Sequence, residues 1–466
     1  MTSELTQKNK TIVWNFWQEM NNARAGNIAN VIRKNLPEYI RWTGPHPINQ
    51  LYGRDAIISD FWQPLLQAFP DLKHEITIFF GGKSNGRADG LFDGQEWVCG
   101  LGHLTGTFKH DWLTIPASGK PTQIRWSEFC RMHEGKIVEL YMLLDIPDVM
   151  RQAGFPMLPP DQGSSEMWLA PKRNDGILLA TQDDRETEKS MKLIRGMIYE
   201  GLNTFDESEL GSMGLAKFFD PQLTWYGPSG IGTNHSLKEF EQNHQQHWLR
   251  AFPDRQVQDL DNLFTEGRFM GASGWTGVVA THTGQYLDCP ATGHKISFNG
   301  IDIWSREGEV ITENWVFVDL IDVYRQFGID LFERMRLQIG KQTSPMSAPS
   351  LLEDCWIPIR SECDINLFAS KVLQLAKDPS KRKAIEGRCY PFRLEQPGNG
   401  FAHSGSQPVK NPALPEITIN TGLVDDWKIT KLPRGTTVLK LGKRATISTL
   451  ARDKARKMGI TIEKVR

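Results

Sequence analysis

Several kinds of signal are scarce in this sequence. Lysine plus arginine number 54 against 55 aspartate plus glutamate, so no excess of charge indicates nucleic acid or an anionic membrane as a partner. The six cysteines form no CxxC pair, and the N-terminus lacks the basic-then-apolar order of a signal peptide. No apolar run approaches the roughly 18–20 residues that span a bilayer. We therefore expect a cytoplasmic protein with reduced thiols and with neither a nucleic-acid nor a membrane partner.

Length and tryptophan content are the first positive signals. A chain of 466 residues is too long for one core, since domains hold roughly 100–200 residues. The 15 tryptophans fall mostly before residue 320. Aromatic-rich interiors suit pockets that hold flat or apolar ligands.

Short motifs occur twice at a constant separation. Trp42-Thr-Gly-Pro matches Trp225-Tyr-Gly-Pro, and Ala68-Phe-Pro-Asp matches Ala251-Phe-Pro-Asp, both 183 positions apart (225 minus 42). A repeated register of this kind is the signature of duplicated units.

A second separation governs the later part of each copy. Pro116-Ala-Ser-Gly matches Pro290-Ala-Thr-Gly 174 positions on (290 minus 116), and the register holds as far as Arg151-Gln-x-Gly and Arg325-Gln-x-Gly. We infer a tandem duplication whose second copy is nine residues shorter in its middle (183 minus 174).

Each copy reads as helices followed by strands. Helical patterns cover about residues 53–69 and 237–252, and runs rich in β-branched and aromatic residues follow. Helices before a meandering antiparallel sheet predict an α+β fold, in which the helices close a curved sheet into a cone. The domain boundaries we expect are 8–156 and 188–336, joined by a linker at 157–187.

The C-terminal part has a different character. We expect a linker with one short helix at 337–416 and a small basic unit at 417–466. From Lys428 to Arg466 twelve lysines and arginines face only Asp453 and Glu463. Residues 448–458 resemble a short segment of ethanolamine-utilisation-type proteins, which implies docking to a protein partner; a solvated basic helix is the alternative.

The repeated motifs together resemble the SnoaL-like polyketide cyclase family of the nuclear-transport-factor-2-like superfamily. The resemblance covers about residues 10–155 and 190–330. It implies two cone-shaped domains with internal pockets, packed as an internal pseudo-dimer or a homo-oligomer. It also implies acid/base catalysis by an aspartate without metal or organic cofactor, which the match places on Asp145 and Asp319. The family's histidine has no counterpart in strands 124–132 and 298–306.

The last strand of each copy carries the candidate site. Side chains alternate along a strand, so Glu139, Tyr141 and Asp145 share one face. The equivalent face of the second copy carries Glu313, Trp315, Phe317 and Asp319. If this face lines the cavity, the carboxylates are desolvated and suited to proton transfer. The alternative is that the aspartates cap the helices that follow them. Other candidate pocket residues are Trp42, His103, Trp225 and Tyr226.

Two functions remain open at this stage. The first is a cofactor-independent enzyme that isomerises, cyclises or hydrolyses a small carbonyl metabolite. The second is a non-catalytic ligand-binding or scaffold protein whose basic tail docks a partner. His244 and His247 have helical metal-ligand spacing, but no complete ligand set accompanies them, so no metal is expected.

Overall fold

A computed structural model describes the chain in two compact units, residues 1–377 and 378–466. The described residues are 4–203, 214–274 and 277–343, and beyond these 369, 372, 373, 382, 416–424, 428, 429, 432, 438–448, 451, 452, 454, 455 and 460–464. Most of the helix expected at 365–376 therefore lies outside the described residues. Within the described part, none of the helices combines the length and apolarity needed to cross a bilayer.

The first copy is a helix-covered, six-stranded mixed sheet of order β2-β1-β6-β5-β4-β3, in which only β1 and β6 run parallel. Its elements are α1 (Glu4–Asn21), α2 (Ile28–Asn35), β1 (Arg41–Thr43), β2 (Gln50–Tyr52), α3 (Arg54–Ala56), the π-helical η1 (Ile57–Trp62), α4 (Gln63–Ala68), β3 (Lys73–Lys83), β4 (Glu96–Thr107), β5 (Pro121–His133), β6 (Lys136–Leu144) and α5 (Ile146–Gln152).

The second copy has the same order of elements. Its six-stranded sheet runs β10-β11-β14-β15-β7-β8, with a small sheet β13-β12-β9 beside it. The elements are α6 (Asp184–Arg195), η2 (Gly196–Gly201), η4 (Leu215–Lys217), β7 (Phe219–Tyr226), β8 (Thr233–Asn234), α7 (Leu237–Phe240), η5 (Glu241–Gln245), α8 (Gln246–Ala251), β9 (Gln256–Val257), β10 (Asn262–Glu266), β11 (Phe269–Ser273), β12 (Val278–Thr281), β13 (Lys295–Ser297), β14 (Gly300–Glu307), β15 (Val310–Val318), α9 (Leu320–Gln326) and α10 (Leu331–Thr343). The predicted α+β fold, present twice, is confirmed.

The sheets differ in continuity. Strands β3, β4 and β5 are unbroken in the first copy, whereas their counterparts are each divided in two, as β9 and β10, β12 and β11, and β13 and β14. The interruption between β13 and β14 falls at Phe298 and Asn299, where the first copy continues through Ile124 and Arg125. The second copy is therefore the more open of the two cones.

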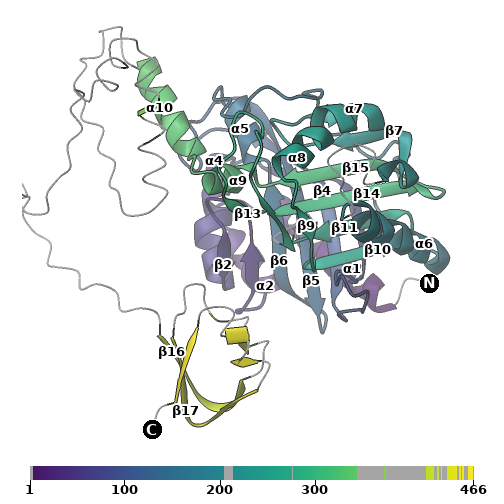
Figure 1. The fold of residues 1–466 in the computed structure, drawn as a ribbon, viewed down its shortest axis with the longest axis vertical. Helices are drawn as coiled ribbons and strands as arrows, with labels where there is room; N and C mark the ends of the chain where they lie inside the picture. Colours follow the sequence, from purple (N-terminus) through teal and green to yellow (C-terminus); the bar gives the residue numbers. More distant parts are fainter. Residues whose placement is uncertain are drawn as a thin grey trace, which may run out of the picture. The chain divides into compact units, whose positions relative to one another are not determined.

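The two sheets pack against each other through one face each. Phe264 of the second copy lies 5.4 Å from Phe80 and 5.5 Å from Phe129, measured between ring centroids. A Cβ atom at Gly271 would lie 3.0 Å from the ring of Phe80, so the close approach of the sheets favours glycine there. Figure 1 shows β14 and β15 running across β5 and β6. The helices of each copy cover the opposite face of its sheet.

The connection between the copies is built into this packing. Ile177 pairs with Phe79 of the first sheet, and Ser164 pairs with Thr233 of the second. Lys10 of α1 reaches across to Glu266 at 2.6 Å and donates to the carbonyl of Leu178 at 2.7 Å. Residues 157–183 thus contact both sheets.

The repeated motifs hold equivalent positions of the two copies in place. The Trp42 ring lies over Gly44, where an added Cβ would come within 1.9 Å of it; at Gly227 a Cβ would lie 2.1 Å from the ring of Trp225. Asp71 of the first Phe-Pro-Asp accepts from the backbone and hydroxyl of Thr107, both at 2.8 Å. Asp254 binds Thr281 in the same way. These motifs therefore make equivalent structural contacts in the two copies.

The C-terminal unit is a small parallel sheet with its own core. Strands β16 (Glu416–Val424), β17 (Val438–Ile447) and β18 (Thr461–Lys464) pair in that order. The buried residues include Leu439, Leu441 and Ile460, with Ala451 and Ala455 from a helical segment between β17 and β18. This unit confirms the small C-terminal element of the predicted fold.

Candidate functional site

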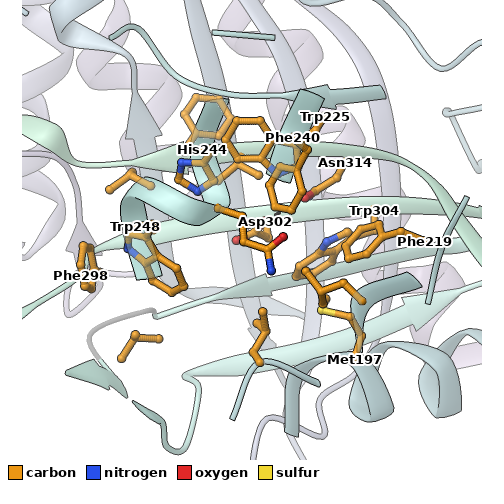
Figure 2. Close-up of a pocket in the computed structure, with 18 of the residues that line it drawn as sticks. Met197, Phe219, Trp225, Phe240, His244, Trp248, Phe298, Asp302, Trp304 and Asn314 are labelled. Atoms are coloured by element: carbon orange, nitrogen blue, oxygen red, sulfur yellow. Dashed lines mark hydrogen bonds between the residues drawn. The ribbon is translucent and has the colours of Figure 1, made fainter. Parts of the chain in front are cut away.

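The second copy contains a cavity between its sheet and its helices. The cavity measures about 110 Å³, and an engineered cavity of ~150 Å³ holds a benzene molecule. Aromatic rings form a large part of its wall, and Figure 2 shows Asp302 between Trp248 on one side and Trp304 on the other. The lining residues are thus suited to a small flat ligand. The side chains among them that carry a polar atom are Trp225, His244, Gln245, Trp248, Tyr286, Asp302, Trp304 and Asn314.

Asp302 is the acidic side chain of this cavity. It lies on β14, is 8% exposed, and accepts a hydrogen bond of 3.0 Å from the Asn314 amide on the neighbouring strand β15. Burial raises the pKa of Asp302 to about 7, although the Asn314 hydrogen bond acts in the opposite direction. A carboxyl group with this pKa can give or take a proton near neutral pH.

Two further polar residues reach the cavity from the helices that cover the sheet. His244 stacks on Trp225 with ring centroids 4.6 Å apart, and burial lowers its pKa to about 3, which leaves it neutral. Gln245, beside it, ends the π-helical segment η5 and is 1% exposed. A π-helical segment is an insertion in an α-helix, and such insertions occur often at functional sites.

The first copy fills the equivalent space with tryptophan. Strand pairing matches Trp126 with Leu144 in one sheet and Gly300 with Val318 in the other, so Trp126 and Gly300 occupy the same position. The Trp126 ring packs 5.0 Å from Trp17 and is fully buried. A glycine at this position in the second copy leaves room for a ligand.

The acidic position is kept in both copies. Glu128 pairs with Met142, as Asp302 pairs with Val316, so the two carboxyl groups are equivalent. In the first copy the Trp17 indole donates to Glu128 at 2.7 Å, and burial raises the pKa of Glu128 to about 8. Glu128 therefore contacts other protein atoms, whereas Asp302 borders the cavity of the second copy.

The predicted strand face faces the other sheet rather than the cavity. Trp315 stacks on Tyr226 at 5.3 Å and donates to the carbonyl of Leu169. Tyr141 donates to the side chain of Asn299 in the second copy. Phe317 packs in the same inter-sheet cluster and also borders the cavity. Apart from Phe317, the residues of β14 and β15 that line the cavity lie on the opposite face of the sheet, at the alternate positions along each strand.

The two predicted acid/base aspartates lie where the copies meet. Asp145 caps α5 by accepting from Asp148, and it also accepts from the backbone of Ser229 at 2.9 Å. Asp319 caps α9 and accepts from the backbone of His46 at 2.7 Å. Each residue therefore caps its own helix and contacts the loop after Gly-Pro of the other copy, which makes the contact reciprocal.

The pKa does not distinguish these aspartates from Asp302. Burial raises the pKa of Asp319 to about 7, against the lowering effect of the His46 and Asp322 amides. Burial also raises the pKa of Asp145, although Arg125 lies 2.8 Å away and lowers it. What distinguishes Asp302 is its position, because neither Asp145 nor Asp319 lines the cavity.

The other predicted pocket residues are divided among several places. Trp225 lines the cavity, whereas Trp42 is buried against Phe61 in the filled first copy. Glu139 forms ion pairs with Arg41 and Arg131, and Glu313 accepts from the backbone of Lys172 and the hydroxyl of Ser305. His103 is buried on β4, and burial lowers its pKa to about 4.

The predicted site does not include Asp302, Asn314 or Gln245. Asp302 keeps an acidic position that the first copy has at Glu128, on the strand face opposite to the predicted one. Asn314 and Gln245 stand at positions where the two copies differ. Aligned by the two registers, the second copy replaces large apolar residues of the first by small or polar ones: Trp62 by Gln245, Trp126 by Gly300 and Leu140 by Asn314. That contrast was a readable signal in the sequence.

Comparison with known proteins gives one family match. A model of the SnoaL-like polyketide cyclase family matches residues 13–153 and again residues 193–327. The matched residues end before the C-terminal unit, so the resemblance of residues 448–458 to ethanolamine-utilisation-type proteins gains no support. No curated protein matches the chain.

Solved structures match one copy at a time. A SnoaL-like protein from Jannaschia sp. CCS1 is 20% identical and covers 32% of this chain and 94% of its own, with a TM-score of 0.25. An NTF2-like protein from Burkholderia thailandensis E264 is 19% identical and covers 32% of this chain and 98% of its own, with a TM-score of 0.23. A SnoaL-like polyketide cyclase from Agrobacterium tumefaciens C58 is 16% identical and covers 30% of this chain and 94% of its own, with a TM-score of 0.22.

Proposed function

This chain belongs to the SnoaL-like polyketide cyclase family, and we propose that its second copy is an enzyme that transfers protons on a small carbonyl compound. The observation that carries the proposal is Asp302, a buried carboxyl group at the wall of a largely apolar cavity, with a pKa raised to about 7. Isomerisation, cyclisation and hydrolysis of carbonyl compounds all use a proton transfer that such a group can perform.

The proposed step uses Asp302 as the base. Its carboxylate removes a proton from the carbon next to the carbonyl, and the electron pair of that C–H bond moves to the carbonyl oxygen as an enolate. The carboxylic acid then returns the proton. Asn314 keeps the carboxyl group in place through the 3.0 Å hydrogen bond. The aromatic walls exclude water and hold the apolar part of the ligand.

We assign the first copy a structural role. Trp126 fills the position that Gly300 leaves empty, and Glu128 already accepts from the Trp17 indole. Asp145 and Asp319, whose oxygens accept from helix-start amides and from the other copy, hold the two copies together in this proposal.

The test is proton exchange, which requires no knowledge of the natural substrate. Small ketones such as acetophenone are incubated with the full chain in D2O, and NMR follows the loss of the α-proton signal. The wild type should accelerate the exchange, and the rate should rise with pH through about 7 as Asp302 loses its proton. The variant Asp302→Asn should lose about 100-fold or more of that acceleration. Exchange that persists in a folded Asp302→Asn variant would refute the proposal.

A further inference from the structure

Gln245 is a buried amide in the cavity whose hydrogen-bonding groups are both unused. It is 1% exposed and lines the cavity. Neither its Nε2 nor its Oε1 atom has a hydrogen-bond partner among the described residues. Buried polar groups in folded proteins are nearly always paired, so an amide with both groups free beside a cavity points to a ligand.

The first copy supports this interpretation by contrast. Its residue at the position of Gln245 is Trp62, which likewise ends a π-helical segment, η1. The Trp62 ring packs against Phe61 with ring centroids 4.9 Å apart, and it offers a single donor, the indole nitrogen, where Gln245 offers both a donor and an acceptor. The same backbone insertion thus presents an indole ring in the first copy and an amide at the cavity of the second.

The charges around the cavity limit the ligand further. No lysine or arginine is found among the described residues that line it, and His244 is neutral because burial lowers its pKa to about 3. Asp302 adds negative charge whenever it is ionised. An anionic ligand would be desolvated there without a cation to pair with it.

We propose that Gln245 is the specificity-determining residue of the cavity, and that it selects an uncharged ligand with a hydrogen-bond acceptor and donor side by side. The amide nitrogen of Gln245 donates to the ligand's acceptor, and the amide oxygen accepts from its donor. A hydroxycarbonyl compound and a primary amide both carry this pair. The inference rests on the proposed function and defines its substrate class.

Four probes separate the ligand properties. Benzamide carries both a hydrogen-bond donor and an acceptor, whereas N,N-dimethylbenzamide carries the acceptor alone. Toluene carries neither group, and benzoate carries a negative charge. Calorimetry at pH 7 with the full chain measures the Kd of each. Benzamide should bind about 10-fold tighter than the other three, as expected for two neutral hydrogen bonds in an apolar site.

The variants identify the residue that causes the preference. Gln245→Leu should remove the preference for benzamide and leave toluene binding unchanged. If the leucine variant folds poorly, Gln245→Met tests the same prediction. Gln242→Leu, on an exposed position of the same segment η5, should keep the wild-type order. An unchanged order in Gln245→Leu or Gln245→Met, or tight binding of benzoate, would overturn the inference.

The same measurement separates this inference from the proposed function. Asp302→Asn should lose proton exchange but still prefer benzamide over toluene. A wild-type chain that exchanges ketone protons without preferring benzamide contradicts the role of Gln245 alone. A chain that binds none of the four probes contradicts both.

Discussion

Asp302 and Glu128 occupy the same position of the two copies but have different surroundings. Glu128 accepts from the Trp17 indole at 2.7 Å within a filled interior. Asp302 accepts from Asn314 at 3.0 Å and borders open space. One acidic position is thus enclosed by protein in the first copy and accessible to a small ligand in the second.

The raised pKa of Asp302 predicts a pH-dependent stability difference. The folded-state pKa of about 7 lies above the ordinary aspartate pKa of 3.8, so the folded state binds the proton more tightly than the unfolded state does. The stability contributed by this group is lost as the pH rises from about 4 to about 7. Asp302→Asn should therefore stabilise the protein at pH 8 by about 2–4 kcal/mol and by much less at pH 4. Urea unfolding at both pH values measures this; equal effects would contradict the account.

Gly300 should be the residue that keeps the cavity open. Gly300→Trp copies the first copy's Trp126 and should raise the Kd for benzamide at least about 10-fold, at a cost of about 1–3 kcal/mol in folding stability. Trp126→Gly is the matched control. It should leave benzamide binding unchanged while destabilising the fold by about 3–5 kcal/mol. Wild-type benzamide binding by a folded Gly300→Trp variant would place the ligand elsewhere.

At the scale of elements, the shared motifs were sufficient to predict the architecture. Arg-Gln-x-Gly ends each capped helix, where Gln152 and Gln326 bond the backbones of Gln123 and Ser297. Contacts within a turn and between neighbouring strands are encoded locally. The duplicated α+β fold was therefore predictable from residue patterns.

The position of the cavity was harder to predict, for a physical reason. Alternation along β15 shows which side chains share a face, but not whether helices or a second sheet cover that face. Both faces of β15 are buried, so polarity gives no contrast. The sequence pattern predicts Trp315 and Glu313 at the cavity, whereas Asn314 and Val316 line it. Only the packing of the two copies resolves the difference.

The helix-capping aspartates give a prediction at this scale. Each Asp319 oxygen has its own donor, Asp322 for one and His46 for the other. Asp319→Ala should cost about 2–4 kcal/mol in unfolding free energy, and Asp319→Asn about half as much because one oxygen remains. Both variants should keep ketone proton exchange. Loss of exchange in a fully stable Asp319→Asn variant would instead favour Asp319 as the proton-transfer group.

At the scale of the 1–377 unit, the two copies share a core. The inter-sheet cluster includes Phe80 and Phe129 from the first copy and Phe264 and Trp315 from the second. The buried ion pair of Lys10 with Glu266 joins the copies as well. The helix-facing surface of the second sheet is thereby left for the cavity.

This shared core predicts cooperative unfolding. Phe264→Ala removes a ring that contacts Phe80 and Phe129 and should destabilise both copies together by about 3–5 kcal/mol. Denaturant unfolding followed by tryptophan fluorescence and by circular dichroism should give one coincident transition for residues 1–377. Two separate transitions, of which Phe264→Ala shifts only the one that belongs to the second copy, would show that the copies fold independently.

The most direct test of the central claim compares the two equivalent carboxyl groups. Proton exchange of acetophenone in D2O is measured for the wild type, Asp302→Asn and Glu128→Gln, each checked for folding. The account predicts that Asp302→Asn loses the acceleration and that Glu128→Gln keeps it, because Asp302 lines the cavity, whereas Glu128 is 1% exposed and accepts from the Trp17 indole. Loss of exchange in a folded Glu128→Gln variant, with Asp302→Asn still active, would contradict the assignment of the active site to the second copy.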